Sequence, residues 1–174
     1  MSAHPTIRDG DKLIIYSDNE IFAVEANIVV EVLETEQFFM LPVIASPSPH
    51  SNREFIKGTM THRGEVIVVI DLSLLFNSPP SQIGQRDDNT IEDDGPCKVA
   101  ITRKDAASLG IYIGKRKLSF LWKEELSNLE LKPSNEDYTL GLIDPSGKKI
   151  RLIDWQKILT KTQEVLSSRN ISLT

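Results

Sequence analysis

GTMTHRGEVIVVIDLSLLF, the stretch at residues 58–76, recurs in altered form as GLIDPSGKKIRLIDWQKIL at residues 141–159. Two glycines and an aspartate keep the same spacing in both copies: Gly58, Gly64 and Asp71, then Gly141, Gly147 and Asp154. Glycine suits tight turns because it has no Cβ, and the apolar run at residues 66–70 is typical of a strand covered on both faces. Each copy therefore predicts a β-hairpin followed by a short helix. Nothing in the repeat is catalytic, so two related β-units favour a binding scaffold.

The composition narrows the class of protein. The chain has 174 residues, 40% of them apolar, which suits one domain or two small lobes sharing a core. No apolar run approaches the ~20 residues of a membrane-spanning helix, and the polar N-terminus lacks a signal-peptide core. The net charge of -5 argues against a general nucleic-acid binder. The single cysteine, Cys97, fits a reducing compartment, so we expect a cytoplasmic protein.

Local patterns predict a chain rich in strands. Outside the two hairpins, strands are expected at residues 12–17, 21–24, 98–102, 109–113, 118–122 and 129–131. Residues 26–34 favour a strand, and a helical turn before Val32 is the alternative. Residues 77–96 are acidic and nearly devoid of apolar groups, which predicts a mobile linker. A stripe of apolar residues predicts a closing helix at about residues 155–166.

The first copy of the repeat resembles a known family. FIKGTMTHRGEVIVVIDL, at residues 55–72, is similar to the signature of the CheW family, the adaptors of bacterial chemotaxis, roughly F-I-x-G-x-x-N-x-R-G-x-x-x-P-V-x-D-L. VVEVL, at residues 29–33, resembles the family's V-x-E-V segment, and residues 138–159 resemble its closing segment. The resemblance extends from residue 12 to about residue 166.

The resemblance implies a mainly β fold of two interlocked SH3-like five-stranded β-barrels, with short helices and a C-terminal helix. It implies a single CheW-like domain at residues 12–166, with a first barrel at about 12–76, the acidic linker at 77–96, and a second barrel with the C-terminal helix at 97–166. Members of the family are not enzymes. They couple the regulatory domain of a CheA-like histidine kinase to the cytoplasmic tips of chemoreceptors, and we expect the same two partners here.

The chain departs from the family pattern in several places. Thr61 stands where the family usually has Asn, Val68 where it has Pro, and Ile113-Gly114 where it has V-D. The linker at residues 77–96 is also long and acidic. These departures fit a divergent paralogue that serves pilus-based motility or another chemosensory array.

The resemblance also implies a protein-binding site at Val29, Glu31, Thr61, His62 and Arg63. Arg63 follows the family motif, and its guanidinium can pair with a carboxylate on a receptor or on Glu31; the alternative is a solvated turn residue. Glu31 is either on an exposed strand face or paired, because an unpaired buried charge is costly. His62 is either a pH-sensitive contact or only a tolerated turn residue. The four glycines of the repeat, Gly58, Gly64, Gly141 and Gly147, are expected at structural turns.

No group of residues predicts catalysis, a metal or a cofactor. The histidines are scattered without carboxylates or cysteines at ligand spacing, and Cys97 has no nearby histidine. Asp71 and Asp154 each precede a predicted helix, which favours capping over a paired-carboxylate active site. We therefore expect a non-enzymatic adaptor that binds no nucleic acid and does not insert into membrane. The alternatives are a small β-barrel that binds single-stranded nucleic acid or another ligand, and an enzyme of unrecognised type.

Overall fold

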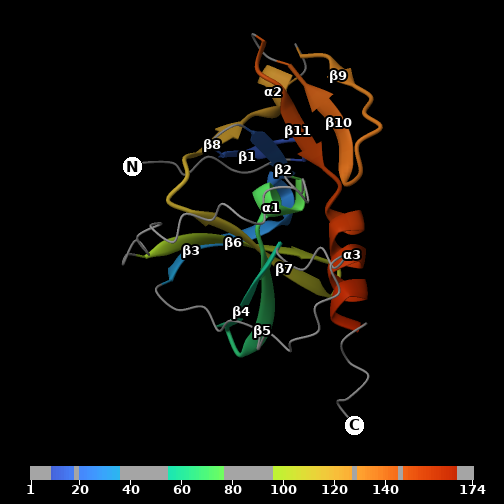
Figure 1. Ribbon diagram of the computed structural model, residues 1–174. Helices are drawn as coiled ribbons and strands as arrows, with labels where there is room; N and C mark the ends of the chain where they lie inside the picture. The colour runs from blue at the N-terminus through green and yellow to red at the C-terminus, as the bar shows by residue number, and fades with distance from the viewer. Residues whose placement is uncertain are drawn as a thin grey trace, which may run out of the picture. The chain divides into compact units, whose positions relative to one another are not determined.

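A computed structural model describes residues 9–17, 20–35, 55–76, 96–126, 129–144 and 147–167 (Figure 1). The described residues are mainly β, as the sequence predicts, and form two sheets. They fall into two compact units, one made of the described residues within 1–30 and 116–174 and the other of those within 31–115. The predicted linker lies outside the described residues except for Pro96, and so do His4 and His50.

The first unit is built on a six-stranded sheet in the order β8-β1-β2-β11-β10-β9. Its strands are β1 (Lys12–Tyr16), β2 (Ile21–Glu25), β8 (Leu118–Leu121), β9 (Leu131–Lys132), β10 (Thr139–Ile143) and β11 (Ile150–Ile153). The short helices are the 3-10 turn η1 (Ala26–Ile28) and α2 (Lys123–Leu126), and the long helix is α3 (Trp155–Ser167). In Figure 1 the blue strands β1 and β2 lie in the same sheet as the orange hairpin β10–β11.

The second unit is built on a five-stranded sheet in the order β3-β6-β7-β5-β4. Its strands are β3 (Val29–Thr35), β4 (Ile56–His62), β5 (Glu65–Ile70), β6 (Cys97–Lys104) and β7 (Ala107–Gly114), and its helix is α1 (Leu72–Phe76). The first two residues of β3 precede the boundary between the units, which falls before Glu31. The segment at residues 26–34 therefore contains both features that its sequence allows, a helical turn in η1 and then the strand β3.

Each sheet combines strands from both halves of the chain, whereas contiguous barrels at residues 12–76 and 97–166 were expected. The reason is a parallel pairing on each hairpin. β11 of the second repeat copy pairs with β2, with Ile150 opposite Ile21, and β5 of the first copy pairs with β7, with Val69 opposite Gly110. Each hairpin therefore completes a sheet begun by strands from the other half of the chain.

The two copies of the repeat have matching local structure. The backbone N–H of Asp71 donates to the carbonyl of Phe55 at 2.7 Å, and that of Asp154 donates to the carbonyl of Tyr138 at 2.7 Å. The pairing register shifts between Ile56 and Gly58 in one hairpin and between Thr139 and Gly141 in the other. A β-bulge at the same place in both copies bends the strands alike.

The repeat glycines fall into two groups. Gly64 (φ 82°) and Gly147 (φ 80°) lie between the strands of the two hairpins, with the positive φ that glycine adopts without strain. Gly58 and Gly141, which the sequence placed at turns, lie within β4 and β10 at the bulges. At Gly141 a Cβ would lie 2.7 Å from Cδ1 of Leu131, so β9 passes too close for a larger residue.

Both repeat helices begin at the predicted caps. Oδ1 of Asp71 accepts the backbone N–H of Ser73 at 2.9 Å, and Oδ1 of Asp154 accepts that of Lys157 at 3.1 Å. An aspartate at this position satisfies one of the free N–H groups of the first turn. These hydrogen bonds confirm capping as the local role of both carboxylates.

Each sheet has its own apolar cluster. In the first unit the cluster consists of Ile14, Ala23, Ile143, Ile150 and Leu152. In the second it consists of Met60, Ile67, Val69, Val99 and Ile101. Helix α3 buries Trp155, Ile158 and Leu159 of the predicted apolar stripe, whereas the last two residues of the stripe, Val165 and Leu166, are only half-buried. Packing in these clusters holds the strands in place, and the second cluster includes residues from both strands of the β4–β5 hairpin.

Candidate protein-binding site

Glu31 joins the two edge strands of the five-stranded sheet. It lies on β3, and its Oε2 is 3.1 Å from Nε2 of His62, the last residue of β4. The same oxygen is 3.4 Å from a terminal guanidinium nitrogen of Arg63. Three strands separate β3 from β4 in the sheet order, so the sheet curls until its edges meet through these side chains. The structure thus brings together three of the five residues that the sequence placed in a binding site.

The three side chains differ in exposure. His62 is 9% exposed, Glu31 is 36% exposed and Arg63 is 75% exposed. Nδ1 of His62 is buried and has no hydrogen-bond partner among the residues that the structure describes. Glu31 is therefore paired rather than only solvated, while Arg63 is paired and still accessible.

The backbone conformation at the hairpin tip determines where the Arg63 side chain lies. Arg63 (φ 49°) and Gly64 (φ 82°) form the two-residue turn between paired His62 and Glu65. Positive φ at both central residues matches the twist of a β-hairpin, as in type I′ turns. Glu65, on the far side of the turn, pairs with Arg103 of β6, whose Nε also donates to Oγ of Ser108 at 2.9 Å. Ion pairs on both sides of the turn therefore anchor the tip.

Exposed valines lie on β3 and β5. Along β3 the exposed fraction alternates, and Val30 (48%) and Val32 (38%) face solvent on either side of Glu31. On β5, Val66 is 73% exposed and stands opposite the exposed Thr61. Val29, at the start of β3, is half-buried on the same face as Glu31. Exposed apolar side chains together with an accessible arginine are typical of a protein-binding surface.

Sequence reasoning missed Val30, Val32 and Val66. The signal was present for β3, because a strand that turns Glu31 inward must turn its two neighbours outward. For Val66 the signal was misleading, because an unbroken apolar run suggested cover on both faces of β5. Only the residues of β5 beyond Val66 are buried or half-buried.

A charge cluster lies in the first unit. Arg151 of β11 donates from Nε to Oε2 of Glu136 at 2.6 Å and pairs with Glu20, and Lys149 pairs with Glu136 at 2.9 Å. The hydrogen bonds from Arg151 and then from Lys149 lower the pKa of the Glu136 carboxyl. Arg151 is only 18% exposed, so this cluster has a structural role in tying β11 to the turn before β10.

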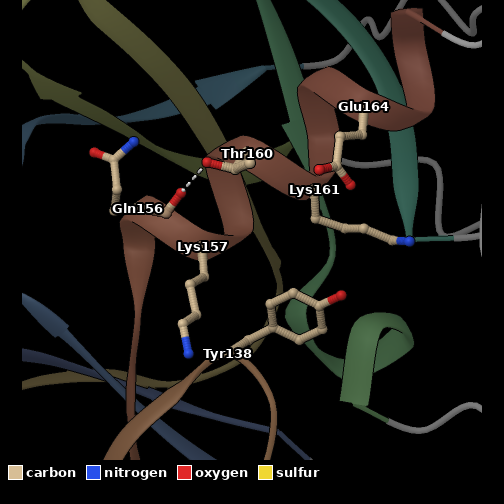
Figure 2. Close-up of a pocket in the computed structure, with 6 residues that line it drawn as sticks. All are labelled: Tyr138, Gln156, Lys157, Thr160, Lys161 and Glu164. Carbon is tan, nitrogen blue, oxygen red and sulfur yellow. Dashed lines mark hydrogen bonds between the residues drawn. The ribbon is translucent and has the colours of Figure 1, made fainter.

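A shallow hollow lies against α3 in the same unit (Figure 2). Its volume is about 310 Å³, and it is lined by Tyr138, Gln156, Lys157, Thr160, Lys161 and Glu164. Figure 2 shows the two lysine side chains running on either side of the Tyr138 ring. Burial, then Asp137 and Glu164, raise the pKa of the Tyr138 phenol, which favours its neutral form. The lining side chains show no nucleophile paired with a base, and the hollow does not suggest a reaction.

The part of the chain that the structure describes presents no candidate metal centre and no candidate membrane span. No group of three or more histidine, cysteine, aspartate or glutamate side chains is placed to hold a metal ion there. None of the helices described there is long and apolar enough to cross a membrane.

Comparison with known proteins defines the class. The CheW-like domain family matches residues 12–163, which is most of the chain, and the chain belongs to this family. Among solved structures it is similar to the scaffolding protein TtCheW from Thermoanaerobacter tengcongensis, with a TM-score of 0.56 and 18% sequence identity. That similarity covers 84% of this chain and 90% of TtCheW, and it confirms the fold. A search of curated proteins found no match.

Proposed function

We propose that the protein is a non-enzymatic, cytoplasmic adaptor that couples a CheA-like histidine kinase to the cytoplasmic tips of chemoreceptors. Its output is chemotaxis or pilus-based motility. Family membership supports a scaffold role, and the absence of a clustered nucleophile, base and orienting group among the described side chains is consistent with it. The mechanism is positional, because two partners held on one body have a high effective concentration for each other.

One observation carries the proposal most directly. Arg63 is 75% exposed at an anchored hairpin tip, and among the described residues its side chain makes one ion pair, the long one to Glu31. A guanidinium in this position can form a bidentate pair with a carboxylate on a receptor helix, while Val30, Val32 and Val66 supply apolar contact area. The proposed binding site consists of these four residues together with Val29, Glu31, Thr61 and His62.

The test is a titration of wild type and Arg63→Ala against a receptor cytoplasmic tip and a kinase regulatory domain from the same organism. Losing a charge-assisted hydrogen bond costs about 1.5–3 kcal/mol, so we expect the affinity for the receptor tip to fall roughly ten- to hundredfold. Lys148→Ala is the matched control, because Lys148 is an exposed cation beside Gly147 in the equivalent hairpin of the first unit. Equal affinities of wild type and Arg63→Ala for both partners would remove Arg63 from the site.

A further inference from the structure

We infer that His62 is a positioning residue for the proposed binding site. Its Nε2–H holds the Glu31 carboxylate between β3 and β4, so that Arg63 can leave Glu31 and pair with a carboxylate on a partner. The part of this inference that concerns a partner rests on the proposed function. The part that concerns His62 and Glu31 stands on the geometry of the free protein.

The two contacts to Glu31 are unequal although they share one oxygen. His62 approaches Oε2 to 3.1 Å with a side chain that is 9% exposed, and Arg63 approaches it to 3.4 Å with a side chain that is 75% exposed. A hydrogen bond shielded from water is electrostatically stronger, whereas an exposed ion pair is weakened by solvent and salt. His62 therefore holds Glu31 more firmly than Arg63 does.

The second ring nitrogen indicates where the proton lies. Nδ1 of His62 is buried without a hydrogen-bond partner among the described residues, and a proton placed there would be an unsatisfied donor. Nε2, by contrast, faces the Oε2 atom, which can only accept when the carboxyl is ionised. The geometry thus favours the tautomer in which Nε2 donates to Glu31.

This arrangement keeps the free-energy cost of separating Arg63 from Glu31 small. A partly buried carboxylate that loses its only donor is costly, and Glu31 keeps His62 when the guanidinium turns outward. The other charged groups at the tip, Glu65 and Arg103, are paired with each other and anchor the turn from the side of β6. The ligand that fits the released guanidinium is a carboxylate-bearing protein surface, which matches its planar fork.

The first experiment uses the free protein and measures thermodynamic coupling in the equilibrium constant for unfolding. Double-mutant cycles combine Glu31→Gln with His62→Leu, with His62→Gln and with Arg63→Ala. We expect a coupling of about fivefold or more between Glu31 and His62, and less than about twofold between Glu31 and Arg63. His62→Gln is the conservative variant, because its amide nitrogen reaches the place of Nε2 and donates without ionising.

The second measurement is the ¹⁵N spectrum of the imidazole, which distinguishes the two tautomers in the wild type and does not depend on how any variant folds. A proton on Nε2 and retention of Glu31 coupling in His62→Gln support the inference. A proton on Nδ1 alone, or no coupling between Glu31 and His62, overturns it.

A measurement of binding affinity distinguishes this inference from the proposed function. With the receptor tip as the probe, His62→Gln should keep the affinity of the wild type and His62→Leu should lose about tenfold, with both variants folded. Equal affinity of folded His62→Leu and wild type would overturn the positioning role. If Arg63→Ala does not affect binding while Glu31 and His62 remain coupled, the proposed site fails and the local geometry stands.

Discussion

Arg63 and Glu31 lie on opposite edges of one five-stranded sheet, and the nearest atoms of their ion pair are 3.4 Å apart. The contact is exposed on the arginine side, whereas its neighbour from His62 to Glu31 is largely shielded from water. A long, exposed contact adds little to stability, so the position of Arg63 is better explained by binding than by folding.

Arg63→Ala should therefore change the free energy of unfolding by no more than about 0.5 kcal/mol, as for an ordinary surface substitution. Urea denaturation of wild type and variant measures this difference. A loss of several kcal/mol would show that the Arg63–Glu31 pair is structural. Glu31→Gln would then destabilise the Arg63→Ala variant less than it destabilises the wild type.

Gly110→Ala should destabilise the five-stranded sheet. A Cβ at Gly110 would lie 3.0 Å from Cγ2 of Val69 and 3.2 Å from Cγ1 of Val99, and both valines are fully buried. Overpacking of this kind costs about 1–3 kcal/mol, which thermal melts can measure. Gly64→Ala is the contrasting variant, because its Cβ would meet nothing within 4 Å and the only penalty comes from its φ of 82°. Unchanged stability of Gly110→Ala would mean that β7 can move away from β5.

The helix caps give a prediction about stability in which one substitution removes the cap and another restores it. Asp71→Ala and Asp154→Ala each remove a side-chain acceptor from the first turn of a helix and should cost about 1 kcal/mol. Asp71→Asn and Asp154→Asn should restore most of the lost stability, because asparagine caps as well as aspartate. If the asparagine variants were as unstable as the alanine variants, the negative charge rather than the hydrogen bond would be essential.

The charge cluster in the first unit predicts that the stability of the protein falls at acidic pH. The bonds from Arg151 and Lys149 lower the pKa of Glu136 below its ordinary value of 4.5. A lowered folded-state pKa contributes stability that is present above the unfolded pKa and is lost as pH falls through the folded one. Wild type should thus be more stable than Glu136→Gln at pH 7, and the difference should shrink below about pH 4.5.

The size of this effect is limited because Glu136 is 37% exposed. Glu164→Gln, which changes an exposed glutamate of α3, is the control for a general effect of charge. A difference between wild type and Glu136→Gln that stays constant from pH 7 to pH 3 would contradict the assigned pairing.

The sequence predicted much of the local structure because local signals decide it. The repeat predicted both hairpins and the helices after them, and the place of Asp71 and Asp154 predicted their caps. It did not predict the exchange of strands between halves, because the parallel pairings β2–β11 and β5–β7 join residues far apart in the chain. No periodicity within one segment encodes such a partner.

The candidate site was predicted less completely. The family motif pointed to Glu31, His62 and Arg63, and the structure brings these side chains together. That one oxygen of Glu31 serves both His62 and Arg63 depends on how the sheet curls, which is a tertiary feature. The exposed face of Val30 and Val32 followed from the orientation of Glu31, which the sequence left open between an exposed and a paired state.

The most direct test of the adaptor role is the formation of a ternary complex. A receptor cytoplasmic tip immobilised on a sensor surface is exposed to the kinase regulatory domain with and without this protein, at concentrations that saturate each pairwise interaction. We expect the kinase domain to be retained strongly only when the protein is present, and we expect Arg63→Ala to reduce this retention while Lys148→Ala does not. Binding of the two partners in competition, so that the kinase domain displaces the protein from the receptor tip, would contradict the adaptor role.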